Sequence, residues 1–192
     1  MAFYPDKITE RFRKPKKAGK PARFSVSASD ASFTCGVSLR FYLEIDSATK
    51  TIKNAGFKTN GCGYVIAFAD FLADRISGER LVNLHGLEDL DNAATEQFGE
   101  IPSTRQHCAN LCFDALHKTL AQYRSQQLGE WTGEKALICT CFGVSEEAIE
   151  SAIAKQSLGS VEEIGNCIHA GTGCGSCQLL IQEILDSASL DS

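Results

Sequence analysis

The sequence lacks any apolar run that approaches the roughly 18 residues needed to span a membrane. Its first residues, "MAFYPDKITERF", also lack the apolar segment of a secretory signal. Acidic residues and prolines within the first 21 positions are atypical of a transit peptide, which is an acid-poor amphipathic helix. We therefore expect a cytoplasmic protein with no membrane partner.

A disulfide framework is not expected either, because the cytosol keeps thiols reduced. The chain nevertheless has nine cysteines among 192 residues, which is many for this length and an odd number. This combination favours metal binding or thiol chemistry over structural disulfides.

Charge is distributed unevenly along the chain. Residues 1–24 have a net charge of +6 and residues 133–192 a net charge of −7, within a total of −5. A basic arm is compatible with nucleic acid, but the overall acidity favours a solvated helix or an arm that docks on an acidic protein. We expect no nucleic-acid partner.

The hydrophobic pattern predicts an α+β domain at residues 1–125. Alternating apolar residues predict strands at 37–46 and 51–61, joined as an antiparallel hairpin, with a third strand at 23–28. Helical spacing and capping residues predict helices at 64–77, 87–98 and 103–127.

A polar stretch with two glycines, residues 126–136, is predicted to be a linker. Beyond it, residues 137–192 are predicted to form a small all-α domain of three short helices. Ser145 and Ser160 are the predicted N-caps of the first two helices, and residues 178–188 form the third.

This small domain contains two close cysteine pairs, Cys139 with Cys141 and Cys174 with Cys177. Two such pairs brought together form a four-thiolate site that suits Zn²⁺ or an iron–sulfur cluster. The neighbouring glycines let the backbone approach a cluster closely, and Cys177 lies at a helix start, where a thiolate is favoured. The spacing alone does not distinguish zinc from iron.

The segments "ALICTCFGVSEE" and "HAGTGCGSC", followed by an amphipathic helix, resemble the bacterioferritin-associated ferredoxin-like domain. The resemblance implies that Cys139, Cys141, Cys174 and Cys177 hold a permanent [2Fe–2S] cluster. Cys167 and His169 lie outside the motif, and we expect neither to be a ligand.

Three more cysteines lie in turn-rich positions before predicted helices or strands, namely Cys35, Cys62 and Cys108. Flanking glycines and helix starts leave a thiol accessible and lower its pKa. The shared setting favours one common site, although each cysteine alone also fits a buried, inert role.

The N-terminal domain resembles the scaffold fold shared by the NifU and IscU families. The matching stretches are "YPDKITERFRKPKKAG", "CG" at 35, "AGFKTNGCGYVIA" and "HC" at 107. The resemblance implies a non-enzymatic scaffold that receives sulfur from a cysteine desulfurase, takes up iron and passes a labile cluster to apo iron–sulfur proteins. It also implies an electron donor, a homodimer and a role in nitrogen fixation or in general cluster supply.

By the same resemblance, Cys35, Cys62 and Cys108 bind the transient cluster, or iron or zinc. Cys108 is the implied persulfide acceptor, and His107 is an alternate ligand. Cys112, one turn beyond Cys108, is expected in the core, with a fourth-ligand role as the alternative.

Three departures from the family pattern bear on this function. Val37 stands where the family has an aspartate ligand that helps make the bound cluster labile. Residues 101–105, "IPSTR", replace the family's chaperone-recognition segment, which weakens the case for a dedicated chaperone. The further C-terminal domain of full-length NifU is not expected within this chain.

Two alternative functions remain open at this point. One is a ferredoxin-like redox or regulatory protein whose N-terminal domain is a degenerate scaffold, which Val37 favours. The other is a structural zinc protein, which fits the cysteine spacing but not the family resemblance.

Overall fold

The computed structural model describes residues 4–33, 35–84, 88–129 and 136–190. The chain forms two compact units, Met1–Tyr123 and Arg124–Ser192. Among the described helices, none is both long and apolar enough to cross a membrane. Residues 126–129 of the predicted linker continue the helix α4 (Gln106–Gly129), and residues 130–135 lie outside the described ranges.

The first unit contains an antiparallel sheet in the order β1-β2-β3. Its strands are β1 (Val26–Ser32), β2 (Val37–Ile45) and β3 (Ile52–Thr59). The predicted hairpin is confirmed, and its turn is fixed by the Asp46 carboxylate, which accepts hydrogen bonds from the backbone N–H groups of Ala48 and Thr49. The third strand begins and ends later than residues 23–28, because β1 pairs along most of β2.

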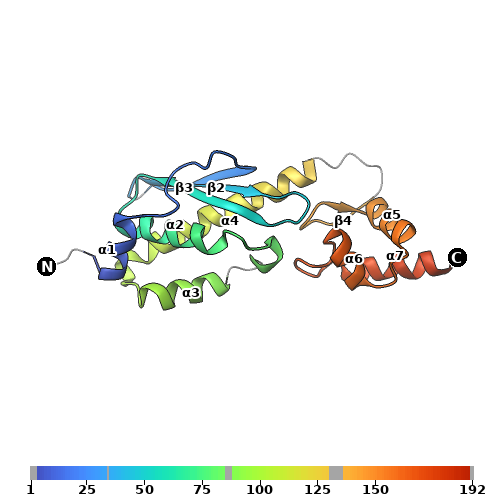
Figure 1. Ribbon diagram of the computed structural model, residues 1–192. Helices are drawn as coiled ribbons and strands as arrows, with labels where there is room; N and C mark the ends of the chain where they lie inside the picture. The colour runs from blue at the N-terminus through green and yellow to red at the C-terminus, as the bar shows by residue number, and fades with distance from the viewer. Residues whose placement is uncertain (1–3, 34, 85–87, 130–135, 191–192) are drawn as a thin grey trace. The chain divides into compact units, whose positions relative to one another are not determined.

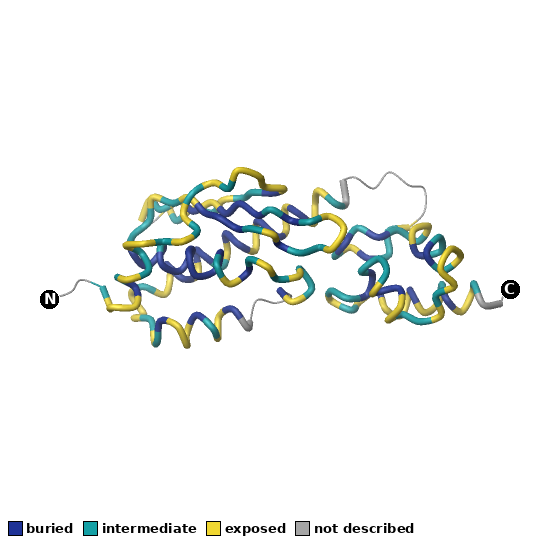
Figure 2. The backbone as a smooth tube through the Cα atoms, in the orientation of Figure 1, coloured by how far each residue is buried: buried dark blue, intermediate teal, exposed yellow. Residues whose placement is uncertain are grey.

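The helices of this unit lie on one side of the sheet (Figure 1). They are α1 (Asp6–Arg13), α2 (Gly63–Ile76), α3 (Glu88–Phe98) and α4, with 3₁₀ turns at Leu81–Leu84 and Ser103–Arg105. Helix α2 packs on the sheet, and α1 and α3 pack against α2. Figure 1 shows α2 lying along the sheet, and Figure 2 shows the buried positions concentrated where they meet. Phe41, Phe68 and Leu116 are fully buried there, so this unit has a substantial core made of hydrocarbon side chains.

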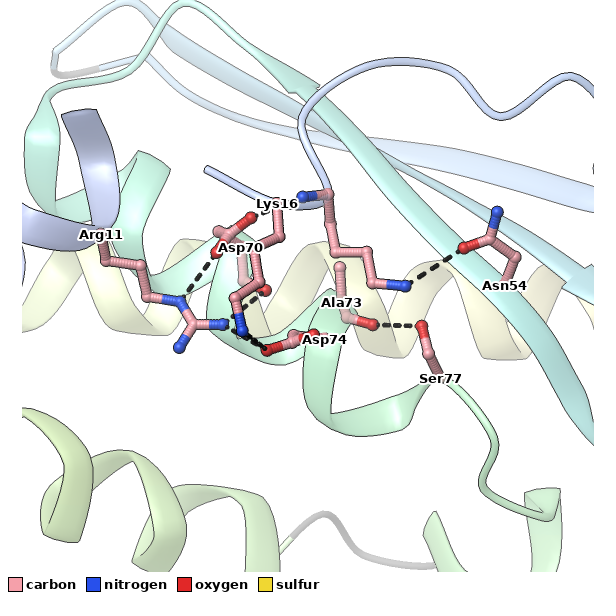
Figure 3. Close-up of polar contacts among 8 residues, drawn as sticks. Arg11, Lys16, Asn54, Asp70, Ala73, Asp74 and Ser77 are labelled. Atoms are coloured by element: carbon pink, nitrogen blue, oxygen red, sulfur yellow. Dashed lines mark hydrogen bonds and ion pairs between the residues drawn. The ribbon is translucent and has the colours of Figure 1, made fainter. Parts of the chain in front are cut away.

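An ion-pair network fastens α1 to α2 (Figure 3). The Arg11 guanidinium donates to the carboxylates of Asp70, at 2.8 Å, and Asp74, at 2.9 Å. Asp70 is fully buried, and its second oxygen accepts the backbone N–H of Lys17 at 2.7 Å. Because an unpaired buried carboxylate is costly, this network ties the start of the chain to the helix that begins just after Cys62.

The second unit consists of a short ladder and three helices. The elements are β4 (Leu137–Cys139), β5 (Val144–Ser145), α5 (Glu146–Gln156), α6 (Val161–Ile168) and α7 (Gln178–Leu190). The three predicted helices are confirmed, as are the two serine caps, whose hydroxyls accept N–H groups from Ala148 and Glu163. The ladder was not predicted, because it is too short to produce an alternating pattern. The fold class, α+β followed by a small helical unit, is confirmed.

Candidate metal centres

In the first unit, Cys62 lies at the N-cap of α2 between two tightly packed glycines. A Cβ atom at Gly61 would lie 2.7 Å from the Val65 Cβ, and one at Gly63 would lie 2.9 Å from a ring carbon of Phe12. No larger residue fits at either position without movement of these neighbours. The two glycines therefore hold the backbone around Cys62 in one place.

Cys108 faces Cys62 from the first turn of α4. The two Sγ atoms are 3.8 Å apart, and the His107 Nε2 lies 3.4 Å from the Cys108 Sγ. Two helix starts that are distant in sequence thus bring together two thiols and an imidazole. His107 is exposed, whereas Cys108 is buried.

Burial raises the pKa of the Cys108 thiol to about 12, and the nearby Cys62 adds to the effect. The prediction that the helix start would lower this pKa was wrong, because desolvation outweighs the dipole. The positive charge of Arg105 acts in the opposite direction but is a smaller contribution. Arg105 also stacks over the ring of Tyr64, at 5.7 Å from its centroid, and the sequence had not marked it as a charge near this site.

Cys35 lies in the turn between β1 and β2 and is exposed. The Ser32 hydroxyl and then the Val37 backbone N–H hydrogen-bond to its sulfur and lower its pKa. Cys35 also exerts an electrostatic effect on Cys108. Of the three cysteines predicted to share a site, the structure brings Cys62 and Cys108 together, and Cys35 does not complete a three-ligand group with them among the described residues.

The position of the family's aspartate is apolar here. Val37 is half-buried against the core, and its Cγ1 lies 3.0 Å from where a Gly61 Cβ would be. Cys112 is fully buried, as predicted for a core residue, and its thiol donates to the Val65 carbonyl at 3.6 Å. Burial raises the pKa of Cys112 well above its usual range, which disfavours the thiolate that a metal ligand needs.

The second unit brings its two cysteine pairs around one cavity of about 220 Å³. The Cys141 and Cys174 sulfurs are 3.4 Å apart, and Cys139 and Cys177 interact through their side chains. Cys139 and Cys177 are buried, whereas Cys174 is exposed. The four thiols therefore form an inner and an outer pair.

The exposed Cys174 differs in its pKa from the other cysteines of the cavity, since burial raises the pKa of Cys141 as well as that of Cys177. The Ser176 hydroxyl and then its backbone N–H lower the pKa of Cys174 to about 7, whereas burial raises the pKa of Cys177 to about 11. The helix-start prediction for Cys177 was therefore wrong, for the same reason as at Cys108. Ser32 and Ser176 are both site residues that the sequence analysis missed, and their placement within three residues of a cysteine in a turn was the available signal.

The donor set fits a two-iron cluster. A Cβ at Gly173 would lie 3.0 Å from the Cys141 Cβ and 3.1 Å from its sulfur, so the glycine permits the close approach of the two cysteine loops. Within the described ranges, no three His, Cys, Asp or Glu side chains are arranged to hold one metal ion. The thiols instead line the cavity in pairs, which suits two irons that each take two thiolates.

Cys167 and His169 have other interactions. The amide of Gln156 lies 3.1 Å from the sulfur of Cys167, and His169 ends α6 in a left-handed conformation with its ring 6.0 Å from that of Phe142. These contacts agree with the prediction that neither is a ligand, which stays a prediction.

Comparison with known proteins identifies a family model for each of the two units. Residues 3–130 match the model of the NifU-like N-terminal domain, and residues 137–187 match the BFD-like [2Fe-2S] binding domain. The nitrogen fixation protein NifU of Trichormus azollae is 32% identical over 96% of this chain. The iron-sulfur cluster assembly scaffold protein IscU of Aquifex aeolicus is 28% identical over 79% of this chain and 94% of its own length.

A crystal structure of the N-terminal part of a NifU-like protein from Brucella abortus shares the fold. It covers 64% of this chain and 95% of its own, with 18% identity and a TM-score of 0.52. The present chain spans 64% of the length of the T. azollae protein. By the two matched domains and their order, the chain belongs to the NifU family and contains a [2Fe–2S]-binding domain.

Proposed function

We propose that this protein is a scaffold on which an iron–sulfur cluster is assembled and from which it is transferred to apo-proteins. The observation that carries the proposal is the meeting of Cys62 and Cys108, 3.8 Å apart, within the NifU-like domain. Iron and sulfide are cargo in this scheme, so the protein has a binding and transfer role without catalytic turnover of its own. The names of the relatives support it.

We propose the following domains and ligands. The proposed scaffold domain is residues 1–125 and the proposed [2Fe–2S] domain is residues 137–192; of the residues 126–136 proposed as the linker, 126–129 continue α4. The transient ligands, for the cluster or for iron or zinc, are Cys35, Cys62 and Cys108, with His107 as the alternate fourth donor. The permanent cluster is held by Cys139, Cys141, Cys174 and Cys177, and when bound it supplies one-electron redox chemistry.

Cys35 is better placed than Cys108 to receive sulfur first. Cys35 is exposed and hydrogen bonds lower its pKa, whereas Cys108 is buried and its pKa is raised. The Cys35 thiolate would attack the outer sulfur of a desulfurase persulfide, which forms a new persulfide on Cys35 and releases the desulfurase cysteine as a thiolate. Cys108 then serves as a ligand at the inner end of the site.

The partners in this scheme are a cysteine desulfurase, apo iron–sulfur proteins and an electron donor, with the scaffold as a homodimer in the cytoplasm. A second candidate function is a ferredoxin-like redox or regulatory protein with a degenerate scaffold domain. Val37 supports this alternative, because its half-buried side chain offers no ligand where the family has a carboxylate.

One experiment separates the two functions. The purified protein is incubated with iron, cysteine and a desulfurase, and labile iron and sulfide are counted in wild type and in a Cys35→Ala/Cys62→Ala/Cys108→Ala variant. A scaffold gains labile iron and sulfide that the variant does not gain. Equal amounts in both would overturn the scaffold function and leave the redox function in place.

A further inference from the structure

A groove of about 400 Å³ lies between α5 and α7 of the second unit. Three carboxylate side chains line it: Glu146 and Glu150, one turn apart on α5, and Glu183 on α7. These carboxylates give the groove a negative lining, which a partner with positive charge would complement.

The groove also has an apolar side. Ile138, Leu180 and Ile184 line it together with the carboxylates. Leu180 is 45% exposed and its neighbour Leu179 is 80% exposed, which makes them two of the four large hydrophobic residues that stand out among the described positions. Apolar side chains beside a ring of like charge are typical of a protein-binding surface.

This groove adjoins the cysteine cavity. Ile138 and Leu180 line both, so they form the wall between the groove and the four thiols. A protein seated in the groove would therefore contact two side chains that also line the cavity of the four thiols.

We propose that the groove is the docking site of a basic redox protein that presents lysine or arginine side chains around an apolar edge. One electron passes there between that protein and the cluster, one partner being oxidised as the other is reduced. The charge of the groove and its exposed Leu180 match such a partner, and the described residues 136–190, with seven acidic side chains and one basic side chain, extend the negative field around it. The inference rests on the proposed redox role of the permanent cluster.

The test uses the full chain with its cluster reconstituted and reduced. Mitochondrial cytochrome c, whose haem edge is ringed by lysines, serves as the probe in stopped-flow measurements at low ionic strength. The variant Glu146→Gln/Glu183→Gln is compared with Glu147→Gln/Glu162→Gln, which removes the same charge and also one acid from the first turn of α5. We expect the rate constant to fall about fivefold to tenfold in the groove variant and less than about twofold in the control.

Neutral benzoquinone as the oxidant reports on the cluster itself, and all three proteins should reduce it at one rate. Equal losses in both variants with cytochrome c would mean that only net charge matters, and no loss would mean that the groove is not used; either result overturns the proposal. A wild-type protein that reduces neither oxidant would refute the redox role instead. Calorimetric binding of cytochrome c to the oxidised proteins would then still decide whether the groove docks a basic protein.

Discussion

The two centres of this molecule are built from the same donor atom but lie in units whose cores differ in size. In the first unit a large hydrocarbon core lies between the sheet and α2; Cys108 is buried in it, whereas Cys35 is exposed at a turn outside it. In the second unit Cys139 and Cys177 are buried and Cys174 is exposed, and the fully buried apolar side chains are fewer, among them Ile149, Ile164 and Ile181.

This difference indicates which centre the fold depends on. A unit with a large apolar core keeps its shape whether or not its thiols hold metal, so cargo can be loaded and released. A small unit whose thiols occupy its interior gains stability from what they bind. On this ground we propose release at the first centre and retention at the second, and four predictions test this proposal.

The largest effect is expected for Cys177→Ser. Loss of one buried ligand should remove all iron from the second unit and its visible absorption, and should lower the melting temperature of that unit while the first unit melts as before. Iron content, visible circular dichroism and thermal unfolding followed by hydrogen exchange measure this. Cys167→Ser is the matched control, and a cluster that survives in Cys177→Ser would contradict the ligand assignment.

Alkylation of the metal-free protein should separate Cys35 from Cys108. With the pKa of Cys108 near 12 and that of Cys35 below its ordinary value, the thiolate fractions at pH 8 differ on the order of a thousandfold or more. Since a lowered pKa makes the thiolate available at lower pH, the Cys35 rate should level off earlier than that of a free thiol. Iodoacetamide labelling with peptide mass spectrometry gives both rates, and equal labelling would argue against Cys35 as the first sulfur acceptor.

Arg11→Ala should destabilise the first unit by about 3 kcal/mol, because it leaves the buried Asp70 without its cation. Lys16→Ala is the control, since Lys16 is largely exposed and its pair with Asp74 contributes less than about 1 kcal/mol. Hydrogen exchange of α1 and α2 in increasing urea measures both changes. If the second unit keeps its metal while the first unit is destabilised, the fold of each unit is stabilised by a different interaction.

This prediction has a pH dependence. Burial raises the pKa of Asp74, but Arg11 and Lys16 outweigh it, so the folded pKa lies below the unfolded one. The contribution of Asp74 is therefore complete above the ordinary aspartate pKa of about 4 and is lost as the pH falls through the lowered value. The difference between wild type and Arg11→Ala should narrow below about pH 4.

The smallest effect is expected for Val37→Asp. If the family's carboxylate makes a bound cluster labile, its return should speed cluster transfer to an apo-ferredoxin, by about threefold to tenfold for a change of roughly 1 kcal/mol in the barrier. Val37→Ala controls for the loss of packing against the core. Slower transfer in the aspartate variant would show that this site is adapted to its valine.

Much of this architecture was predictable from local pattern. Alternation at residues 37–46 identified β2, helical spacing at 64–77 identified α2, and the serine caps marked α5 and α6. The cysteine pairs were visible as spacing. These features depend on neighbours along the chain, which is the information that a single sequence displays directly.

The features that were not predictable depend on depth or on distant contacts. Burial raised the pKa values of Cys108 and Cys177, where a lowered pKa was expected. The sequence of a helix start does not show how deeply that helix start is buried. The partnership of Arg11 and Asp70 spans 59 residues, and the acidic groove between α5 and α7 exists only once the two helices pack. The difference in exposure between Cys35 and Cys108 also depends on the tertiary fold and could not be predicted from the sequence.

The ion-pair network of Figure 3 also bears on the order in which the chain acquires its structure during synthesis. The segment with Arg11 is translated early but finds its partners only when Asp70 and Asp74 have been made. Contacts of such sequence separation form late, because a long loop must close before they are gained. A partial chain that stops before Asp70 lacks the partners that hold α1 in place, and one that stops before Cys108 lacks one of the proposed ligands, so the proposed site can be completed only after α4 has begun to be made.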